Sequence, residues 1–145
     1  MMSEEEQDSS GGVVFCSAEF AEKLDDFSDL FKKHKQPMAE AERFAMAIGI
    51  VKNSRLPKDE WKEGKKKRKG TQGLSTFEEG GKYNFRILFE MLDLWDEDDD
   101  VSLTLTISEY ITGGMKWLTE NEMIDGSKFS ILKEEFPDLF LNENN

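Results

Sequence analysis

An acidic stretch of the chain has residue types and a spacing that would suit a calcium-binding loop. Asp98, Asp100 and Ser102 stand at alternate positions, and Glu109 is the twelfth residue counted from Asp98. Carboxylate and hydroxyl oxygens at this spacing bind Ca²⁺ in an EF-hand loop. The sharp turn of that loop needs glycine at its sixth position, where this chain has Leu103. The pattern therefore departs from the motif at a required position, and a solvated acidic loop is the competing interpretation.

The same region offers a second set of carboxylates, which would serve a Mg²⁺-dependent nuclease. They are Glu90, Asp93, Asp96 and Asp98. Carboxylates alone do not make such a site, because the nucleophile must also be activated and positioned. No base or lysine at a suitable spacing completes it. We therefore expect no catalytic residues and no cofactor, and the nuclease is the third of three hypotheses on function.

A run of cations stands out in this otherwise acidic chain. It consists of Lys62, Lys65, Lys66, Lys67, Arg68 and Lys69. Clustered cations can bind DNA phosphates without reading the base sequence, so these residues are candidates for nucleic-acid binding. The competing interpretation is a solvated loop, or a segment that pairs with the chain's own acidic residues. Trp61 could stack on a base, although a lone tryptophan is more often a packing anchor.

Two further reactive residue types occur once each, without the partners that chemistry would need. His34 lies among lysines, with no cysteine or aspartate at metal-ligand spacing. Cys16 is the lone cysteine, which excludes an internal disulfide and fits a reducing environment. We expect Cys16 to be a small, buried hydrophobic residue.

The composition predicts one folded domain of acidic character. Of 145 residues, 37% are hydrophobic, which is enough for a core. Asp and Glu number 31 against 19 Lys and Arg, giving a net charge of −12. Such a chain repels nucleic acid overall, so DNA contact must be local, and a basic protein is an equally suitable partner. The polar N-terminus is unlike a signal peptide, and no apolar run could span a bilayer, so we expect a cytoplasmic protein.

The elements that would position these residues begin with a strand and two helices. Val13–Cys16 is a β-branched and apolar run that predicts a strand. Ser17 is a good N-cap for an amphipathic helix over 18–33. A second helix over 36–55 has Pro37 in its first turn. It carries a ridge of small residues against which another backbone could pack, namely Ala41, Ala45 and Gly49.

The second half of the chain is less regular. Residues 55–81 are rich in glycine and lysine and predict a long basic loop. A helix should follow over 82–95. The alternation over 101–107 predicts either a second strand or an extended lead into the next helix. Ser108 is the expected N-cap of that helix. Its central Gly113-Gly114 pair favours close packing against another element.

These patterns predict a mainly α fold with a minor β contribution. It is a single small helical domain over 13–138, in which a short N-terminal strand and two helices precede the long basic loop and two to three further helices, the last over 129–136. Residues 1–12 should form a disordered acidic tail and 139–145 a flexible tail. The expected core residues are Phe20, Leu24, Phe27, Phe44, Ile48, Phe85, Leu88, Phe89, Leu92, Tyr110 and Trp117.

The order strand, helix, helix over 13–52 resembles the ribbon-helix-helix arrangement, in which strands of two chains pair and enter a DNA groove. Base reading needs polar or basic side chains on the strand, whereas Val13–Cys16 is apolar. We therefore expect this strand to be core or a dimer ribbon. A dimeric DNA-binding transcriptional regulator is the second hypothesis on function.

Two segments together are informative: ERFAMAIGIVKNSR over 42–55 and ISEYITGGMKWL over 107–118, preceded by VVFCSAEFAEKLDDF. They resemble the Dnd system-associated proteins, a family encoded beside DNA phosphorothioation systems. The GKKKRKG run and the acidic ends depart from the family. The resemblance implies a prokaryotic accessory to DNA modification or phage defence, with no active-site residues to carry over.

The first hypothesis on function follows from this resemblance. It is a non-catalytic accessory that binds a protein partner in a DNA-modification or restriction complex. Sequence-independent DNA contact would come from Lys65–Lys69, and the chain could form a homodimer.

Overall fold

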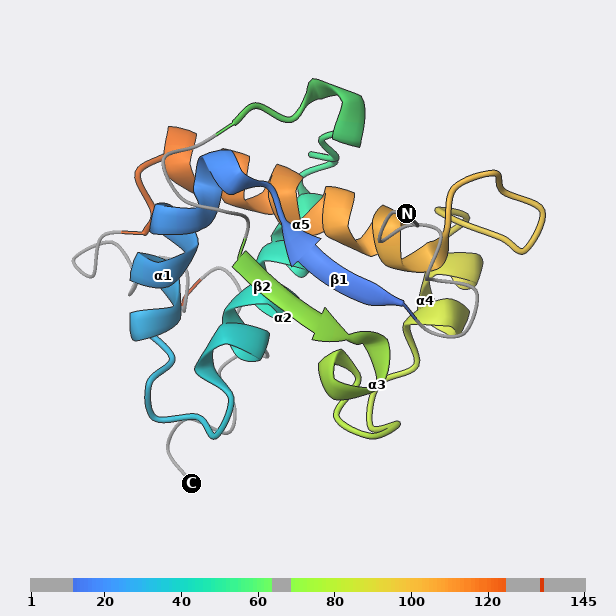
Figure 1. The fold of residues 1–145 in the computed structure, drawn as a ribbon, viewed down its shortest axis with the longest axis horizontal. Coiled ribbons are helices and arrows are strands. Elements are labelled where there is room, and N and C mark those ends of the chain that lie inside the picture. The colour runs from blue at the N-terminus through green and yellow to red at the C-terminus, as the bar shows by residue number, and fades with distance from the viewer. Residues whose placement is uncertain (1–11, 64–68, 125–133, 135–145) are drawn as a thin grey trace.

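The computed structural model describes residues 12–63, 69–124 and 134. Over these residues the fold is mainly helical with a minor β contribution, as predicted, and the β contribution is a two-stranded sheet (Figure 1). The tails predicted for 1–12 and 139–145 and the helix predicted over 129–136 lie outside the described residues, except at residues 12 and 134. Within the described ranges, no helix combines the length and apolarity that crossing a bilayer requires.

The elements follow one another in a strand-first order. They are β1 (Val13–Cys16), a 3₁₀ turn (Ala18–Phe20), α1 (Ala21–Asp29), α2 (Pro37–Val51), a 3₁₀ turn (Lys58–Glu60), β2 (Lys69–Gly73), α3 (Leu74–Phe77), α4 (Phe85–Met91) and α5 (Leu103–Glu120). The predicted strand and the first two helices are confirmed, although α1 and α2 both end about four residues earlier than expected, at Asp29 and Val51. Ser17 caps the 3₁₀ turn before α1 by accepting the Glu19 N–H, as predicted.

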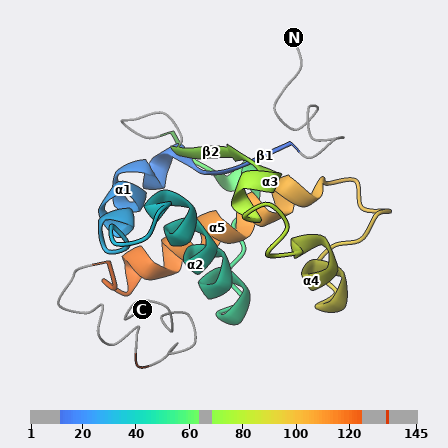
Figure 2. The same cartoon turned by 90° about the horizontal axis from the view of Figure 1, so that it is seen from below.

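The sheet covers one side of two crossing helices. Strand β1 packs against α5 and β2 against α2, and α2 and α5 pack against each other behind the sheet. The C-terminal end of α2 and the whole of α4 extend on the side away from the sheet (Figure 2). The molecule therefore has a sheet face and an opposite, helical face.

The predicted loop over 55–81 is partly wrong, because β2 and α3 lie within it. Strands β1 and β2 are antiparallel, with Val13 opposite Gly73 and Cys16 opposite Lys69. The β2 sequence, KGTQG, has no apolar alternation, and Thr71 is its one residue of a type enriched in strands. Its extended state is therefore conferred by pairing with β1, which a local pattern does not reveal.

Both alternatives predicted over 101–107, a second strand or an extended lead into the next helix, are also wrong, because α5 already begins at Leu103. Its N-cap is Ser102, whose hydroxyl accepts the Leu105 N–H at 3.1 Å, and not Ser108. The alternating hydroxyl residues are accommodated in a helix by bonding back one turn: Thr106 Oγ1 donates to the Ser102 carbonyl at 3.0 Å. This local bond lets β-branched threonines occupy a helix.

Helix α5 also accepts hydrogen bonds from the N-terminal strand and from the residue that follows it. The Phe15 N–H donates to Ser108 Oγ at 3.0 Å, and the Ser17 N–H donates to Thr112 Oγ1 at 3.1 Å. Val14, Phe15 and Cys16 are buried, so the core role expected for this strand is confirmed. In a ribbon-helix-helix protein the strand pairs with a strand of a second chain, whereas here β1 pairs with β2 of its own chain.

The close packing predicted from small residues is confirmed. A Cβ built on Gly114 would lie 1.8 Å from the Ala45 carbonyl oxygen. One built on Gly113 would lie 1.7 Å from the carbonyl oxygen of Ser54, just beyond α2. Backbone therefore meets backbone where α2 and its exit cross α5, at a distance that excludes any side chain.

Most of the expected core residues are buried, and many core residues are aromatic. The exceptions are Leu88 and Leu92 on and just after α4, which are exposed, and Trp117, which is only partly buried against the core. The prediction of Leu88 and Leu92 as core residues is wrong, because their side of α4 is not covered.

Candidate functional site

Helix α4 has one buried face and one exposed apolar face. Phe85 and Phe89 face inward, and the Phe89 ring meets the Tyr110 ring edge-on at 5.7 Å. On the other side, Ile87 is 50% exposed, Leu88 38%, Met91 79% and Leu92 47%. We call these four residues the α4 apolar face.

The α4 apolar face is continuous because its spacing follows the helix. Ile87 and Met91 are four residues apart, as are Leu88 and Leu92, so both pairs stack along one side. Asn84 fixes the start of the helix by accepting the Ile87 N–H at 3.1 Å. A surface helix normally turns its apolar side to the core and its polar side to solvent. In α4, Phe85 and Phe89 are covered, but the four further apolar residues are exposed and available for contact.

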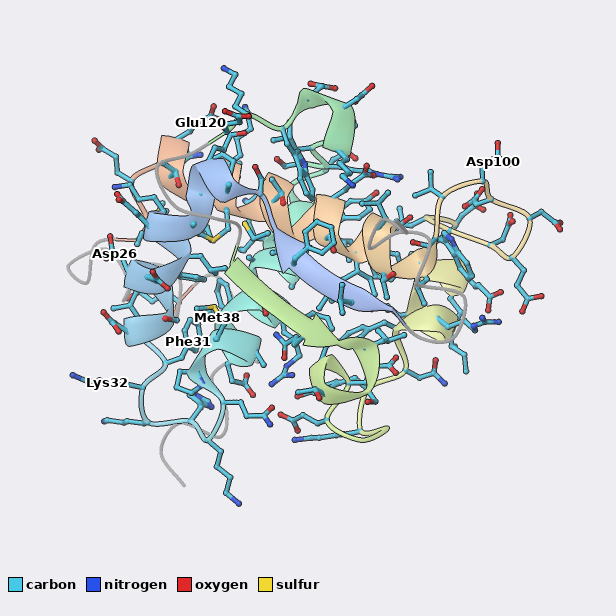
Figure 3. All side chains as sticks on the ribbon, in the orientation of Figure 1. Asp26, Phe31, Lys32, Met38, Asp100 and Glu120 are labelled. Carbon is cyan, nitrogen blue, oxygen red and sulfur yellow. The ribbon has the colours of Figure 1, made fainter. Side chains whose placement is uncertain are left out.

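Acidic side chains border the α4 apolar face. Glu90 and Asp93 lie on and beside the helix, and the loop that follows it is a run of exposed carboxylates at Asp96–Asp100. This loop is held against α4, because Glu97 pairs with Arg86 and the Arg86 guanidinium lies 5.4 Å from the centre of the Trp95 ring. Asp100 points away from the body of the molecule at this end (Figure 3).

A groove of about 970 Å³ adjoins the α4 apolar face. It lies between α2 and the α3–α4 segment, and Leu88 lines it as well as belonging to the exposed face. One of its polar lining residues is Arg43, which donates to the Phe77 carbonyl at 2.7 Å and to Glu79 at 2.8 Å. The guanidinium also lies 5.1 Å from the Tyr83 ring centre. Because its charge is already matched by carboxylates, Arg43 ties α2 to α3 rather than offering an anion site.

A second buried charged group lies near the sheet. Glu42 is fully buried on α2 and accepts a hydrogen bond from the Gln72 side chain on β2. Its Oε2 has no hydrogen-bond partner among the described residues. Burial raises the pKa of Glu42 well above its ordinary value, an effect that Gln72 and Arg43 oppose. Since Glu42 does not line the groove, a substrate there would not reach it.

The residues predicted to bind calcium do not assemble into a site. Asp98 and Asp100 are exposed on the loop, whereas Ser102 caps α5. Glu109 is buried and accepts from Arg55 Nε at 2.8 Å. No group of three or more His, Cys, Asp or Glu residues is arranged to hold a metal within the described part of the chain.

The same finding applies to the carboxylates considered for a nuclease, Glu90, Asp93, Asp96 and Asp98. Asp96 instead stabilises its own turn, since its Oδ1 accepts the Asp98 N–H at 2.8 Å. Its own N–H donates to Asp99 Oδ2 at 3.1 Å. Within the described part of the chain, these four side chains are not grouped so that they could hold a metal.

The basic run lies mostly outside the described residues. Lys65, Lys66, Lys67 and Arg68 are not described, and Lys69 is described only through its backbone in β2. Lys62 is exposed, and its N–H donates to Glu19 Oε1 at 3.2 Å. Contact of this run with DNA therefore stays a prediction.

The other singled-out residues have structural roles. The Trp61 ring meets Phe15 edge-on at 5.5 Å, and its Nε1–H donates to the Leu56 carbonyl at 2.8 Å, so it is a packing anchor. Cys16 is buried as predicted, and burial raises the pKa of its thiol. His34 borders the groove and packs against the Phe31 ring.

The α4 apolar face is the feature that sequence reasoning missed. The signal for it was present, because six of the eight residues over 85–92 are large and apolar, more than one buried face needs, but the pattern does not say which of them are covered.

A scan against protein-family models finds no match, and searches for similar curated proteins and for similar solved structures find none.

Proposed function

We propose that this protein is a non-catalytic accessory that binds a protein partner through the α4 apolar face. The observation that carries the proposal is the exposure of four large apolar side chains on one side of a single helix. Contiguous exposed apolar surface of this kind marks interaction sites in folded proteins. The adjoining groove extends the surface through Leu88, so a partner side chain could enter it.

The energy available at this face is sufficient for a specific contact. Fully burying one large apolar side chain contributes about 1.5–3 kcal/mol relative to leaving it exposed. The four residues are already partly buried, so the gain per residue is smaller, and a few such anchors dominate typical interfaces. Met91 is the most exposed and its side chain is flexible, which suits an anchor that adapts to its partner.

The proposal also includes the kind of complex in which the protein binds its partner. The resemblance to Dnd system-associated proteins supports a prokaryotic DNA-modification or phage-defence complex as the place where the partner is found. In such a complex, the basic run over Lys65–Lys69 would add sequence-independent contact with DNA phosphates.

The test is co-purification of the tagged protein from its native cells, comparing the wild type with Met91→Glu. A charge in the middle of the α4 apolar face must be desolvated when a partner docks, so we expect the partner to be lost. Asn121→Asp makes the same one-unit charge change just beyond α5, at the far end of the molecule from α4 (Figure 2), and should retain the partner. Equal recovery with Met91→Glu and wild type would contradict the proposal.

A further inference from the structure

On the side of the loop that follows the helix, the α4 apolar face is bordered mainly by carboxylates. Between residues 85 and 102 the only cation in the sequence is Arg86, and it is paired with Glu97. The remaining charged side chains there are carboxylates, and they are exposed: Glu90, Asp93, Asp96, Asp98, Asp99 and Asp100. The apolar surface and the negative potential therefore belong to one continuous region.

Side-chain contacts hold the acidic loop beside α4. Trp95 Nε1–H donates to the Val101 carbonyl at 2.8 Å, which closes the base of the loop. The Arg86–Glu97 pair and the contact of Arg86 with the Trp95 ring join the loop to the helix. Neighbouring carboxylates repel one another, so holding them together opposes folding unless a cation relieves the repulsion.

We infer that the partner docking on α4 presents a basic amphipathic helix, with apolar side chains against the α4 apolar face and lysine or arginine against the acidic loop. This inference rests on the proposed function and names the chemistry of the partner. Complementary charge around an apolar centre speeds association and selects among partners.

The same charges disfavour the other occupants of this face. A second copy would bring its own Asp96–Asp100 loop toward an identical face, and each copy carries a net charge of −12. Nucleic acid and anionic lipid headgroups would meet the same repulsion. A basic protein segment is the occupant whose charge the surface matches.

The experiment uses three synthetic amphipathic helices of about 18 residues with the same leucine pattern. Their polar positions are all lysine, all glutamine or all glutamate. Each is titrated into the ¹⁵N-labelled full chain while the backbone amides are followed by NMR. We expect the lysine peptide to shift the amides of α4 and of the 96–100 loop, with binding about tenfold weaker at about 500 mM salt than at about 50 mM.

Matched variants distinguish attraction of the peptide to the acidic loop from its attraction to the negatively charged protein as a whole. The triple change Asp98→Asn, Asp99→Asn and Asp100→Asn should weaken binding of the lysine peptide by about fivefold or more. The control changes the same number of charges on α1, at the opposite end of the molecule from Asp100 (Figure 3), as Glu22→Gln, Asp26→Asn and Asp29→Asn. The control should bind within about twofold of the wild type.

The outcomes separate this inference from the proposed function. If the glutamine or glutamate peptide binds α4 as well as the lysine peptide does, the basic partner is wrong while partner binding through α4 stands. If the α1 control loses as much affinity as the Asp98–Asp100 variant, the attraction is general and the inference fails. If no peptide shifts the α4 amides, the inference also fails, and co-purification with Met91→Glu decides the proposed function separately.

Discussion

Glu42 is the residue whose chemistry is most altered by the fold. It is enclosed between α2 and β2, with the Gln72 side chain as its hydrogen-bond donor. A buried carboxylate is costly unless it is fully hydrogen-bonded, and burial accordingly raises the pKa of Glu42 from its ordinary value of 4.5. The folded protein therefore holds a proton at Glu42 in a pH range where the unfolded chain releases it.

This proton uptake predicts a pH-dependent penalty on folding. As pH rises above about 4.5, Glu42 ionises more readily in the unfolded chain, so stability falls by up to about 1.4 kcal/mol per pH unit until the folded-state pKa is reached. Glu42→Gln keeps an acceptor for Gln72 and cannot ionise. We expect the variant to match the wild type near about pH 4.5 and to be more stable by at least about 1 kcal/mol at neutral pH.

Urea unfolding of both proteins across this pH range measures the difference directly. All other carboxylates titrate in both proteins and cancel in the comparison. Parallel pH profiles would show that the Glu42 pKa is not raised by folding.

At the scale of elements, the crossing of α2 and α5 depends on glycine. The Cβ of alanine at position 114 would lie 1.8 Å from the Ala45 carbonyl oxygen, and backbone of a packed helix does not move aside cheaply. Gly114→Ala should therefore destabilise the protein by about 3 kcal/mol or more, despite alanine's better helix propensity. Chemical denaturation gives the value.

Gly73→Ala is the matched control for this substitution. Gly73 has an ordinary φ of −65°, and among the described residues no atom lies within 4 Å of a Cβ built there. Its change in stability should stay within about 1 kcal/mol. Similar losses for both variants would mean that the α2–α5 contact is not as close as the structure shows.

Helices α2, α3, α4 and α5 end in the same way, with a left-handed residue that is not glycine. Asn53, Glu79, Asp93 and Glu122 have φ between 52° and 59°. After α4, the Asp93 N–H donates to the Glu90 carbonyl at 3.1 Å and the Leu94 N–H donates to the Phe89 carbonyl at 2.8 Å, which is a Schellman motif.

Glycine is the residue that this position favours, because the left-handed conformation costs a residue with a Cβ about 1–2 kcal/mol. We expect Asp93→Gly to raise the free energy of unfolding by about 1 kcal/mol, measured by thermal or urea unfolding. Asp98→Gly removes the same charge from the same region at a position without positive φ, and should bring no such gain. Equal effects would attribute the gain to charge alone.

At the scale of the whole molecule, excess negative charge opposes folding. The net charge of −12 is partly concentrated in the loop beside α4, where Asp96–Asp100 follow one another. Salt screens this repulsion, so raising NaCl from about 50 mM to about 500 mM should raise the melting temperature by about 2–5 °C.

The triple variant Asp98→Asn, Asp99→Asn and Asp100→Asn should show a smaller rise, because less repulsion remains to be screened. KCl should act like NaCl if screening is the cause. A melting temperature that falls with either salt would instead indicate that attractive ion pairs, such as the one between Arg55 and Glu109, dominate the electrostatics.

Local sequence alone determined several elements of this fold. The β-branched Val13–Cys16 run, the Ser17 cap and the period of α2 are local properties, and local physics is enough to predict them. The Gly113-Gly114 pair also predicted a close contact, because two glycines inside a helix lower its stability and are expected only where another element packs closely against them.

Tertiary structure alone decided the features on which the proposed function rests. Strand β2 is extended because β1 pairs with it. Ser108 lies inside α5, where its hydroxyl accepts the Phe15 N–H of β1 and does not cap a helix. The apolar residues of α4 divide into a buried and an exposed face only when Tyr110 and the rest of the core cover one side. The spacing of apolar residues along a chain shows that a helix has an apolar side, but whether that side is buried depends on residues distant in sequence. Only the folded molecule therefore reveals the α4 apolar face.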